Sequence, residues 1–176
     1  MLEIPDILEY LPSQRSQFAK GQLRDEWYEK YPDIFDEQDY KNARDQQKNH
    51  FFEWFTAVRL YEMAGYLSLV EKYGRFKTTN RGPRKWQVVQ EFVGRQLISP
   101  ALLDLMQHPA KHDFPKAQQC PDLFVYTRNF SDWHLCETKA WSERFHGQQE
   151  NYFHKLGETS GRQVVIVRLR EIGLQA

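Results

Sequence analysis

The sequence from Cys120 to Lys139 reads CPDLFVY-TRNFSD-WHLCETK, and it decides the fold. Two apolar runs of strand length flank residues 127–132, whose composition is typical of a hairpin loop. Side chains alternate between the faces of a strand, so we expect Glu137 and Lys139 on the same face. If the two runs pair, Asp122 and Glu137 meet at the open end of the hairpin. Two carboxylates beside an ammonium suit a divalent metal ion and an attacking water.

The composition is typical of one globular domain. The 176 residues suffice for one proper core, and 40% hydrophobic with 27% charged residues is ordinary for a soluble protein. Aromatic residues make up 15% of the chain, which argues against disorder. No apolar run approaches a membrane span, and the N-terminus lacks the features of a signal peptide. With only two cysteines, we expect an intracellular, cytoplasmic protein without a disulfide framework.

Residues 1–48 are polar and acid-leaning, and we expect them to form a helical appendage. The main domain would then span residues 49–176. Short helices are predicted around residues 4–11, where a proline suits the first turn, and around residues 16–31. Pro32 would end the second of these helices. Aromatic side chains in this segment predict that it packs onto the main domain.

The strongest helix pattern covers residues 46–64, where apolar side chains recur at helical spacing. Gly65 would end that helix. Residues 66–73 fit either a further helix or a strand, and the pattern does not decide between them. Further helices are predicted over residues 86–97 and from Ser99, which would cap a helix whose first position is a proline.

The C-terminal part predicts a crossover unit. Residues 148–156 form a short amphipathic helix, and residues 164–167 read as a buried strand. A helix between residues 133–139 and this strand implies that the two strands are parallel. The fold class is therefore mixed α/β.

One loop between residues 72 and 85 concentrates basic side chains, although the formal net charge of the chain is zero. Such a loop suits contacts to phosphates, and its aromatic neighbours could stack on bases. The alternative is a solvated surface loop. The predicted nucleic-acid contacts in the loop are Arg75, Lys77, Arg81, Arg84 and Lys85.

Other site chemistries are weakly supported. The sequence has no glycine-rich phosphate loop and no Gly-x-Ser-x-Gly motif. A zinc site could draw on His112, Cys120, His134 and Cys136, but neither pair has zinc-finger spacing. We interpret both cysteines as small hydrophobic residues.

The motif Pro121-Asp122 followed by Glu137-Thr138-Lys139 resembles the signature of the PD-(D/E)xK nucleases. The segment after Lys139 is further similar to VRR-NUC domains, which occur as stand-alone nucleases and in the Fanconi-associated nuclease. This similarity rests on Arg144, Gln149, Tyr152, Leu156 and residues 164–167. The sequence departs from the family at Cys120 and Ala140, where glycine is common, and at Tyr152, where tryptophan is common.

The resemblance implies a restriction-endonuclease-like core and Mg²⁺- or Mn²⁺-dependent hydrolysis of DNA phosphodiesters. Asp122 and Glu137 would bind the metal together with the Thr138 carbonyl. Lys139 would orient or activate the water, and Gln149 would lie beside the site. A helix glutamate would complete the site, best matched by Glu53, with Glu62 and Glu71 as alternatives. Arg144 joins the predicted DNA contacts.

The resemblance leaves the substrate open among linear, branched and flapped DNA, in a repair, recombination or phage-related setting. Junction cleavage needs paired active sites, so a homodimer is also an open expectation. Two alternatives stay open as well. One is a non-catalytic nuclease-fold module that binds nucleic acid or protein, and the other is a restriction-type or RNA nuclease of the same superfamily.

Overall fold

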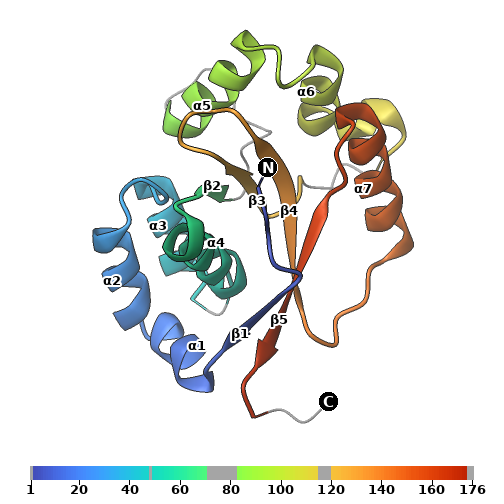
Figure 1. The fold of residues 1–176 in the computed structure, drawn as a ribbon. Coiled ribbons are helices and arrows are strands. Elements are labelled where there is room, and N and C mark those ends of the chain that lie inside the picture. The colour runs from blue at the N-terminus through green and yellow to red at the C-terminus, as the bar shows by residue number, and fades with distance from the viewer. Residues whose placement is uncertain (1, 48, 71–82, 115–119, 174–176) are drawn as a thin grey trace.

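The computed structural model describes residues 2–47, 49–70, 83–114 and 120–173 (Figure 1). The strands in this part are β1 (Ile7–Tyr10), β2 (Leu67–Val70), β3 (Leu123–Tyr126), β4 (Trp133–Ala140) and β5 (Val165–Glu171). The helices in it are α1 (Pro12–Ala19), α2 (Gln22–Lys30), α3 (Glu37–Asp45), α4 (Phe51–Ala64), α5 (Pro83–Gly94), α6 (Pro100–Gln107) and α7 (Gly147–Ser160), with a 3₁₀ turn, η1, at Pro109–His112.

The strands of the described residues form one mixed sheet with the order β1-β5-β4-β3-β2. The pairs β2–β3 and β3–β4 are antiparallel, whereas the pairs β4–β5 and β5–β1 are parallel. The predicted α/β class is confirmed, and so is the parallel pairing across α7. From α4 onward the order of elements is α4, the strands β2, β3 and β4, then α7 and β5. Helices α5 and α6 are inserted between β2 and β3.

Helices cover both faces of the sheet, which gives three layers (Figure 1). On one face, α1 to α4 pack on alternate strand residues such as Val125 and Val167. On the other face, α5, α6 and α7 pack on residues such as Phe124 and Leu135. This division follows from the alternation of side chains along each strand. The two cores are thus separated by the sheet itself.

The predicted hairpin is confirmed. Leu123 pairs with Cys136 and Tyr126 pairs with Trp133, and residues 127–132 connect the strands. The Thr127 N–H donates to the Asp132 carbonyl at 3.0 Å, which closes the loop. Strand β4 is longer than β3. Its last residues therefore pair with β5 along one edge and have no β3 residue along the other.

The helix predicted over residues 4–11 is wrong, because Ile7–Tyr10 forms the edge strand β1. Leu8 and Tyr10 are buried while Ile7 and Glu9 are exposed, which is the two-residue period of a strand. The strand pairs in parallel with β5. The N-terminal segment is therefore joined to the sheet through a strand as well as through its helices.

Several other predictions can be compared directly. The helix predicted over residues 16–31 is split into α1 and α2 at Gly21, whose φ of +94° breaks the first helix. Helix α4 begins five residues later than predicted and ends at Gly65 as predicted. Residues 66–73 contain the strand β2, so the strand alternative holds there. Ser99 caps α6 as predicted, accepting from the Leu102 N–H at 3.1 Å.

The N-terminal helices contribute to the core as predicted. Phe18 of α1 is fully buried and makes edge contacts with Phe51 and Trp54 of α4. Phe35 stacks on Trp54 with ring centroids 3.7 Å apart. None of the helices among the described residues has both the length and the apolar character that a membrane span requires.

Candidate functional site

The site forms at the start of β3, where β4 extends past the end of β3 and keeps only β5 as a neighbouring strand. Asp122 immediately precedes β3 and lies opposite Glu137, whose Oε2 accepts from the Asp122 N–H at 3.2 Å. The Asp122 Oδ2 atom accepts from the Thr138 N–H at 2.9 Å and from its hydroxyl at 2.6 Å. The Asp122 side chain therefore takes the place of a backbone acceptor at the end of the β3–β4 ladder.

The Thr138 carbonyl faces the same edge of β4 as its N–H. In an extended strand the N–H and C=O of one residue point to the same side. Since the Thr138 N–H is directed at Asp122, the carbonyl is directed toward that side as well. This is the orientation that the predicted role of Thr138 requires.

Glu137 is held from two elements. Its side chain is about 6% exposed, and Oε1 accepts from Gln149 Nε2 at 2.8 Å and lies 2.9 Å from Lys139 Nζ. Gln149 lies in the first turn of α7, so the crossover helix reaches back to the strand that precedes it. The structure thus brings together four residues predicted from sequence: Asp122, Glu137, Lys139 and Gln149.

Glu53 approaches the same group from the first turn of α4. Burial, reinforced by the nearby carboxylates of Asp122 and Glu137, raises the pKa of Glu53 to about 8. The alternative Glu62 lies two and a half turns further along the helix, where it accepts from the Tyr31 hydroxyl at 2.5 Å and pairs with Arg59. The second alternative, Glu71, lies outside the described residues.

The electrostatics show an excess of negative charge at this point. Burial, followed by the nearby Asp122 carboxylate, raises the pKa of Glu137 to about 7. Burial also raises the pKa of Asp122, although the hydrogen bonds from Thr138 oppose the shift. The pKa of Lys139 is lowered by burial but raised overall by two carboxylates, Glu137 and Glu143. The Lys139 ammonium therefore pairs with two carboxylates, those of Glu137 and Glu143.

A divalent ion fits the donor chemistry of this group. Carboxylate and carbonyl oxygens are the ligands that Mg²⁺ and Mn²⁺ prefer. Burial raises the pKa values of Glu53, Asp122 and Glu137, and a bound cation would favour their ionised forms. Within the described ranges, however, no three Asp, Glu, His or Cys side chains are already gathered into a metal-binding group. Both Asp122 and Glu137 are engaged by protein donors, so an ion would bind with side-chain rearrangement.

No family model, curated protein or solved structure matches this chain. The resemblance to PD-(D/E)xK nucleases therefore rests on the residues of the chain itself and on their arrangement.

The basic residues predicted to contact nucleic acid have different outcomes. Arg75, Lys77 and Arg81 lie outside the described residues. The prediction that Lys85 contacts nucleic acid is wrong. Its side chain is about 1% exposed and donates to the Asp39 carboxylate and the Val70 carbonyl. A buried ammonium with these partners has no access to a DNA phosphate. It was predicted as a contact because it belongs to the basic run between residues 72 and 85. Its partner Asp39 is 46 residues away in the sequence, so the run itself did not indicate the burial.

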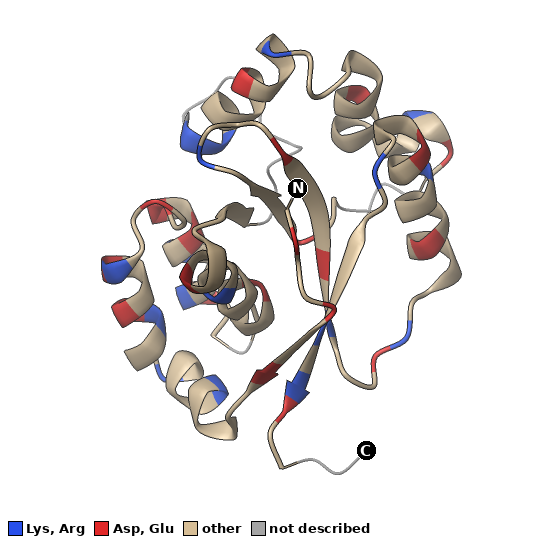
Figure 2. Cartoon of the chain, viewed as in Figure 1, with Lys and Arg blue, Asp and Glu red and all other residues tan. Residues whose placement is uncertain are grey.

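Arg84 is also used inside the protein. Its guanidinium donates to the Asp33 carbonyl at 2.7 Å and also to the Ile34 carbonyl. These bonds join α5 to the connection between α2 and α3. Arg144, in contrast, is exposed in the loop that follows β4. Figure 2 shows basic and acidic residues interspersed over the helices in that view, in keeping with the net charge of zero.

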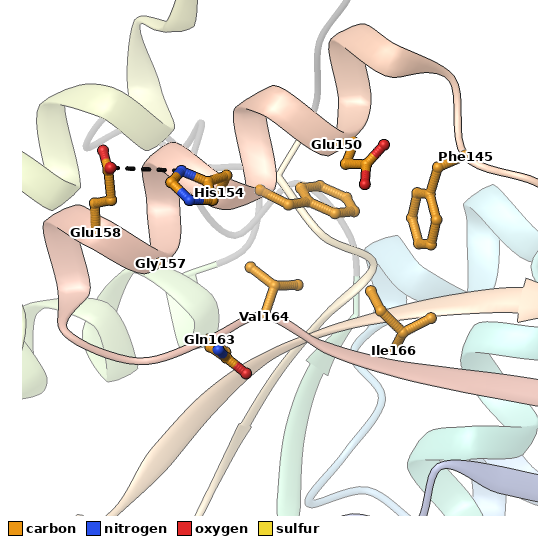
Figure 3. Close-up of a pocket in the computed structure, with 9 residues that line it drawn as sticks. Phe145, Glu150, His154, Gly157, Glu158, Gln163, Val164 and Ile166 are labelled. Carbon is orange, nitrogen blue, oxygen red and sulfur yellow. Dashed lines mark ion pairs between the residues drawn. The ribbon is translucent and has the colours of Figure 1, made fainter.

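A groove lies beside the site, between α7 and the start of β5 (Figure 3). Its volume is about 440 Å³. The lining residues are Phe145, Glu150, Phe153, His154, Gly157, Glu158, Gln163, Val164 and Ile166. Phe145 connects the groove to the site, since Lys139 Nζ lies 5.4 Å from its ring centroid. None of the described residues that line the groove is a Lys or Arg, so this part of the lining is not suited to phosphate binding.

Sequence reasoning missed Glu143. Its Oε1 accepts from Lys139 Nζ at 3.1 Å, which adds a fourth acid to the group. The available signal was weak. A glutamate four residues after the motif lysine lies past the end of the strand, where strand alternation no longer predicts which way a side chain points.

Proposed function

We propose that the protein is a Mg²⁺- or Mn²⁺-dependent DNA endonuclease of the VRR-NUC type. The observation that carries the proposal is the convergence of Glu53, Asp122 and Glu137 on Lys139 and Gln149. Glu53 comes from α4, Asp122 from the position before β3, Glu137 and Lys139 from β4, and Gln149 from α7, so α4 contributes from far away in the sequence. Their meeting at one point is what the resemblance requires.

The order of elements also supports the proposal. A restriction-endonuclease-like core would need a helix, three antiparallel strands, a helix and a parallel strand. The chain presents this order from α4 to β5, with the motif residues at the junction of β3 and β4. Strand β1 would then be an addition at the edge next to β5.

The roles of the residues follow from their contacts. Asp122, Glu137, Glu53 and the Thr138 carbonyl would hold the ion. When bound, the ion would supply a Lewis acid for the phosphate and lower the pKa of a water molecule. Gln149 fixes the Glu137 carboxylate through its 2.8 Å hydrogen bond.

Lys139 supplies fixed positive charge. Its ammonium lies beside Glu137 and is mostly buried, so its attraction for a phosphate is less screened than that of a surface lysine. In this position it can orient a water molecule and stabilise the negative charge that develops on the phosphate during hydrolysis.

Cleavage of a substrate panel tests the proposal. The panel contains linear duplex, flapped DNA, a four-way junction and RNA, each with Mg²⁺, Mn²⁺ or EDTA. We expect metal-dependent cleavage of at least one DNA substrate. Asp122→Asn, Glu137→Gln and Lys139→Ala should each lower the rate at least about 100-fold, as removal of a transition-state contact does. Circular dichroism should show that the variants keep the fold.

Matched controls exclude a general charge effect. Glu91→Gln removes an exposed acid on α5 and Lys155→Ala removes an exposed lysine on α7, and both should leave the rate unchanged. Undiminished cleavage by all three site variants, or cleavage in EDTA, would reject the proposal. Folded protein that binds DNA without cutting it would favour the non-catalytic module. Junction cleavage would call for a homodimer, which light scattering would detect.

A further inference from the structure

Lys139 has a second acidic partner outside the motif. Glu143 lies in the loop between β4 and α7, and its two oxygens have different tasks. Oε1 accepts from Lys139 Nζ at 3.1 Å, and Oε2 accepts from the Ala140 N–H at 3.3 Å. The carboxylate therefore joins the lysine side chain to the end of its own strand.

The loop that carries Glu143 is itself held in place. Arg168 of β5 donates from Nη1 to the Glu143 carbonyl at 3.0 Å and to the Trp141 carbonyl at 3.4 Å. Phe145 then places its ring 5.4 Å from Lys139 Nζ. Lys139 is thus surrounded by Glu137, Glu143 and an aromatic ring, with the loop anchored to the neighbouring strand.

Charge balance gives Glu143 a specific task. In the structure the Lys139 ammonium pairs with both Glu137 and Glu143. A divalent ion shared by Asp122 and Glu137 would take up the Glu137 charge and repel the Lys139 ammonium. A carboxylate that is not an ion ligand would then keep the ammonium beside the substrate. Glu143 is the described acid in that position, and its side chain is 47% exposed, so it serves no packing role.

We propose that Glu143 is a positioning residue that holds the Lys139 ammonium in its working place. The inference rests on the proposed function of Lys139. A lysine ammonium has three donors, and Glu137 and Glu143 take two of them, which leaves the third for a water or a phosphate oxygen.

The contact can be tested on the metal-free protein, independently of activity. The rate at which an amine-reactive ester labels Lys139 is followed by mass spectrometry in the wild type, Glu143→Ala and Glu143→Gln. We expect severalfold faster labelling in Glu143→Ala and a smaller increase in Glu143→Gln, whose amide oxygen still accepts from Nζ but carries no charge. Glu91→Gln is the matched control, because Glu91 is 46% exposed and pairs with Arg95 at i,i+4. Unchanged labelling in Glu143→Ala would overturn the proposal.

The effect on cleavage is measured in the same variants. Glu143→Ala should lower kcat roughly tenfold with little change in KM for DNA, because only the placement of a reacting group is altered. Glu143→Gln should recover part of the loss, because it keeps the hydrogen-bond acceptor but not the charge. In a Lys139→Ala background, Glu143→Ala should cost nothing further. A loss that persists there would assign Glu143 to loop structure instead. If the wild type cleaves no substrate, the nuclease proposal fails, whereas the labelling still decides the contact.

Discussion

Binding of a divalent ion to this site should release protons. Carboxylates must be ionised to bind a metal, and two of these acids hold protons at neutral pH. With pKa values of about 8 for Glu53 and about 7 for Glu137, the first is about 90% protonated at pH 7 and the second about 50%. Binding one ion at pH 7 should therefore release about 1.4 protons, and at pH 8.5 only about 0.3.

Isothermal titration calorimetry measures this number directly. Mn²⁺ is titrated into metal-free protein at one pH in PIPES and in Tris, which have different ionisation enthalpies. The slope of the observed enthalpy against the ionisation enthalpy of the buffer is the number of protons exchanged. Because protons compete with the ion, the affinity should also weaken as the pH falls from 8.5 to 6.

Glu53→Gln identifies the source of the protons. It removes the group with the highest pKa, so the release at pH 7 should fall to about 0.5, the share of Glu137 alone. Identical heats in the two buffers with the wild type would refute the reasoning, since they would mean that the acids are already ionised. A release of about 1.4 that survives in Glu53→Gln would remove Glu53 from the site.

Three predictions concern stability, measured by urea or thermal unfolding. Asp39→Ala should cost about 3–5 kcal/mol because it removes the carboxylate of a buried ion pair with the Lys85 ammonium, whereas the exposed Glu37→Ala should cost under about 1 kcal/mol; equal losses would contradict this. Phe18→Ala should cost about 3–5 kcal/mol, and a loss under about 1 kcal/mol would show that the N-terminal segment is not part of the core. Glu53→Gln should raise the Tm of the metal-free protein at pH 8.5 more than at pH 5. The folded-state pKa of Glu53 exceeds its ordinary value, so stability falls as the pH rises from about 4.5 to 8, and equal shifts would argue against it.

Local patterns predicted the part of the fold that carries the motif. The hairpin of β3 and β4 follows from two apolar runs and a turn-rich link. The ends of α4 and α6 follow from Gly65 and Ser99, whose conformations are set by their own neighbours. For the same reason the meeting of Asp122 and Glu137 could be predicted, since it depends only on the pairing of adjacent strands.

Features that depend on distant partners could not be predicted. Strand β1 is only four residues long, and the strand that satisfies its backbone lies at the other end of the sequence. The burial of Lys85 depends on Asp39 of α3, so its place in a basic run was misleading. Glu53 was the preferred helix glutamate from the sequence, but Glu62 occurs in the same helical pattern. Only the packing of α4 on the sheet places Glu53 near Asp122 and Glu137 and leaves Glu62 beside Tyr31.

The pairing of β1 with β5 also constrains how the chain can fold as it is made. Glu9 and Arg170, which face each other across these strands, are 161 residues apart. At about 5 to 20 residues per second, a ribosome needs roughly 8 to 30 s to synthesise that interval. For that time β1 has no partner strand, and its exposed backbone could pair with another nascent chain. Strand β1 has only four residues and carries Glu9 on its exposed face. Both features limit pairing with another nascent chain until β5 is synthesised.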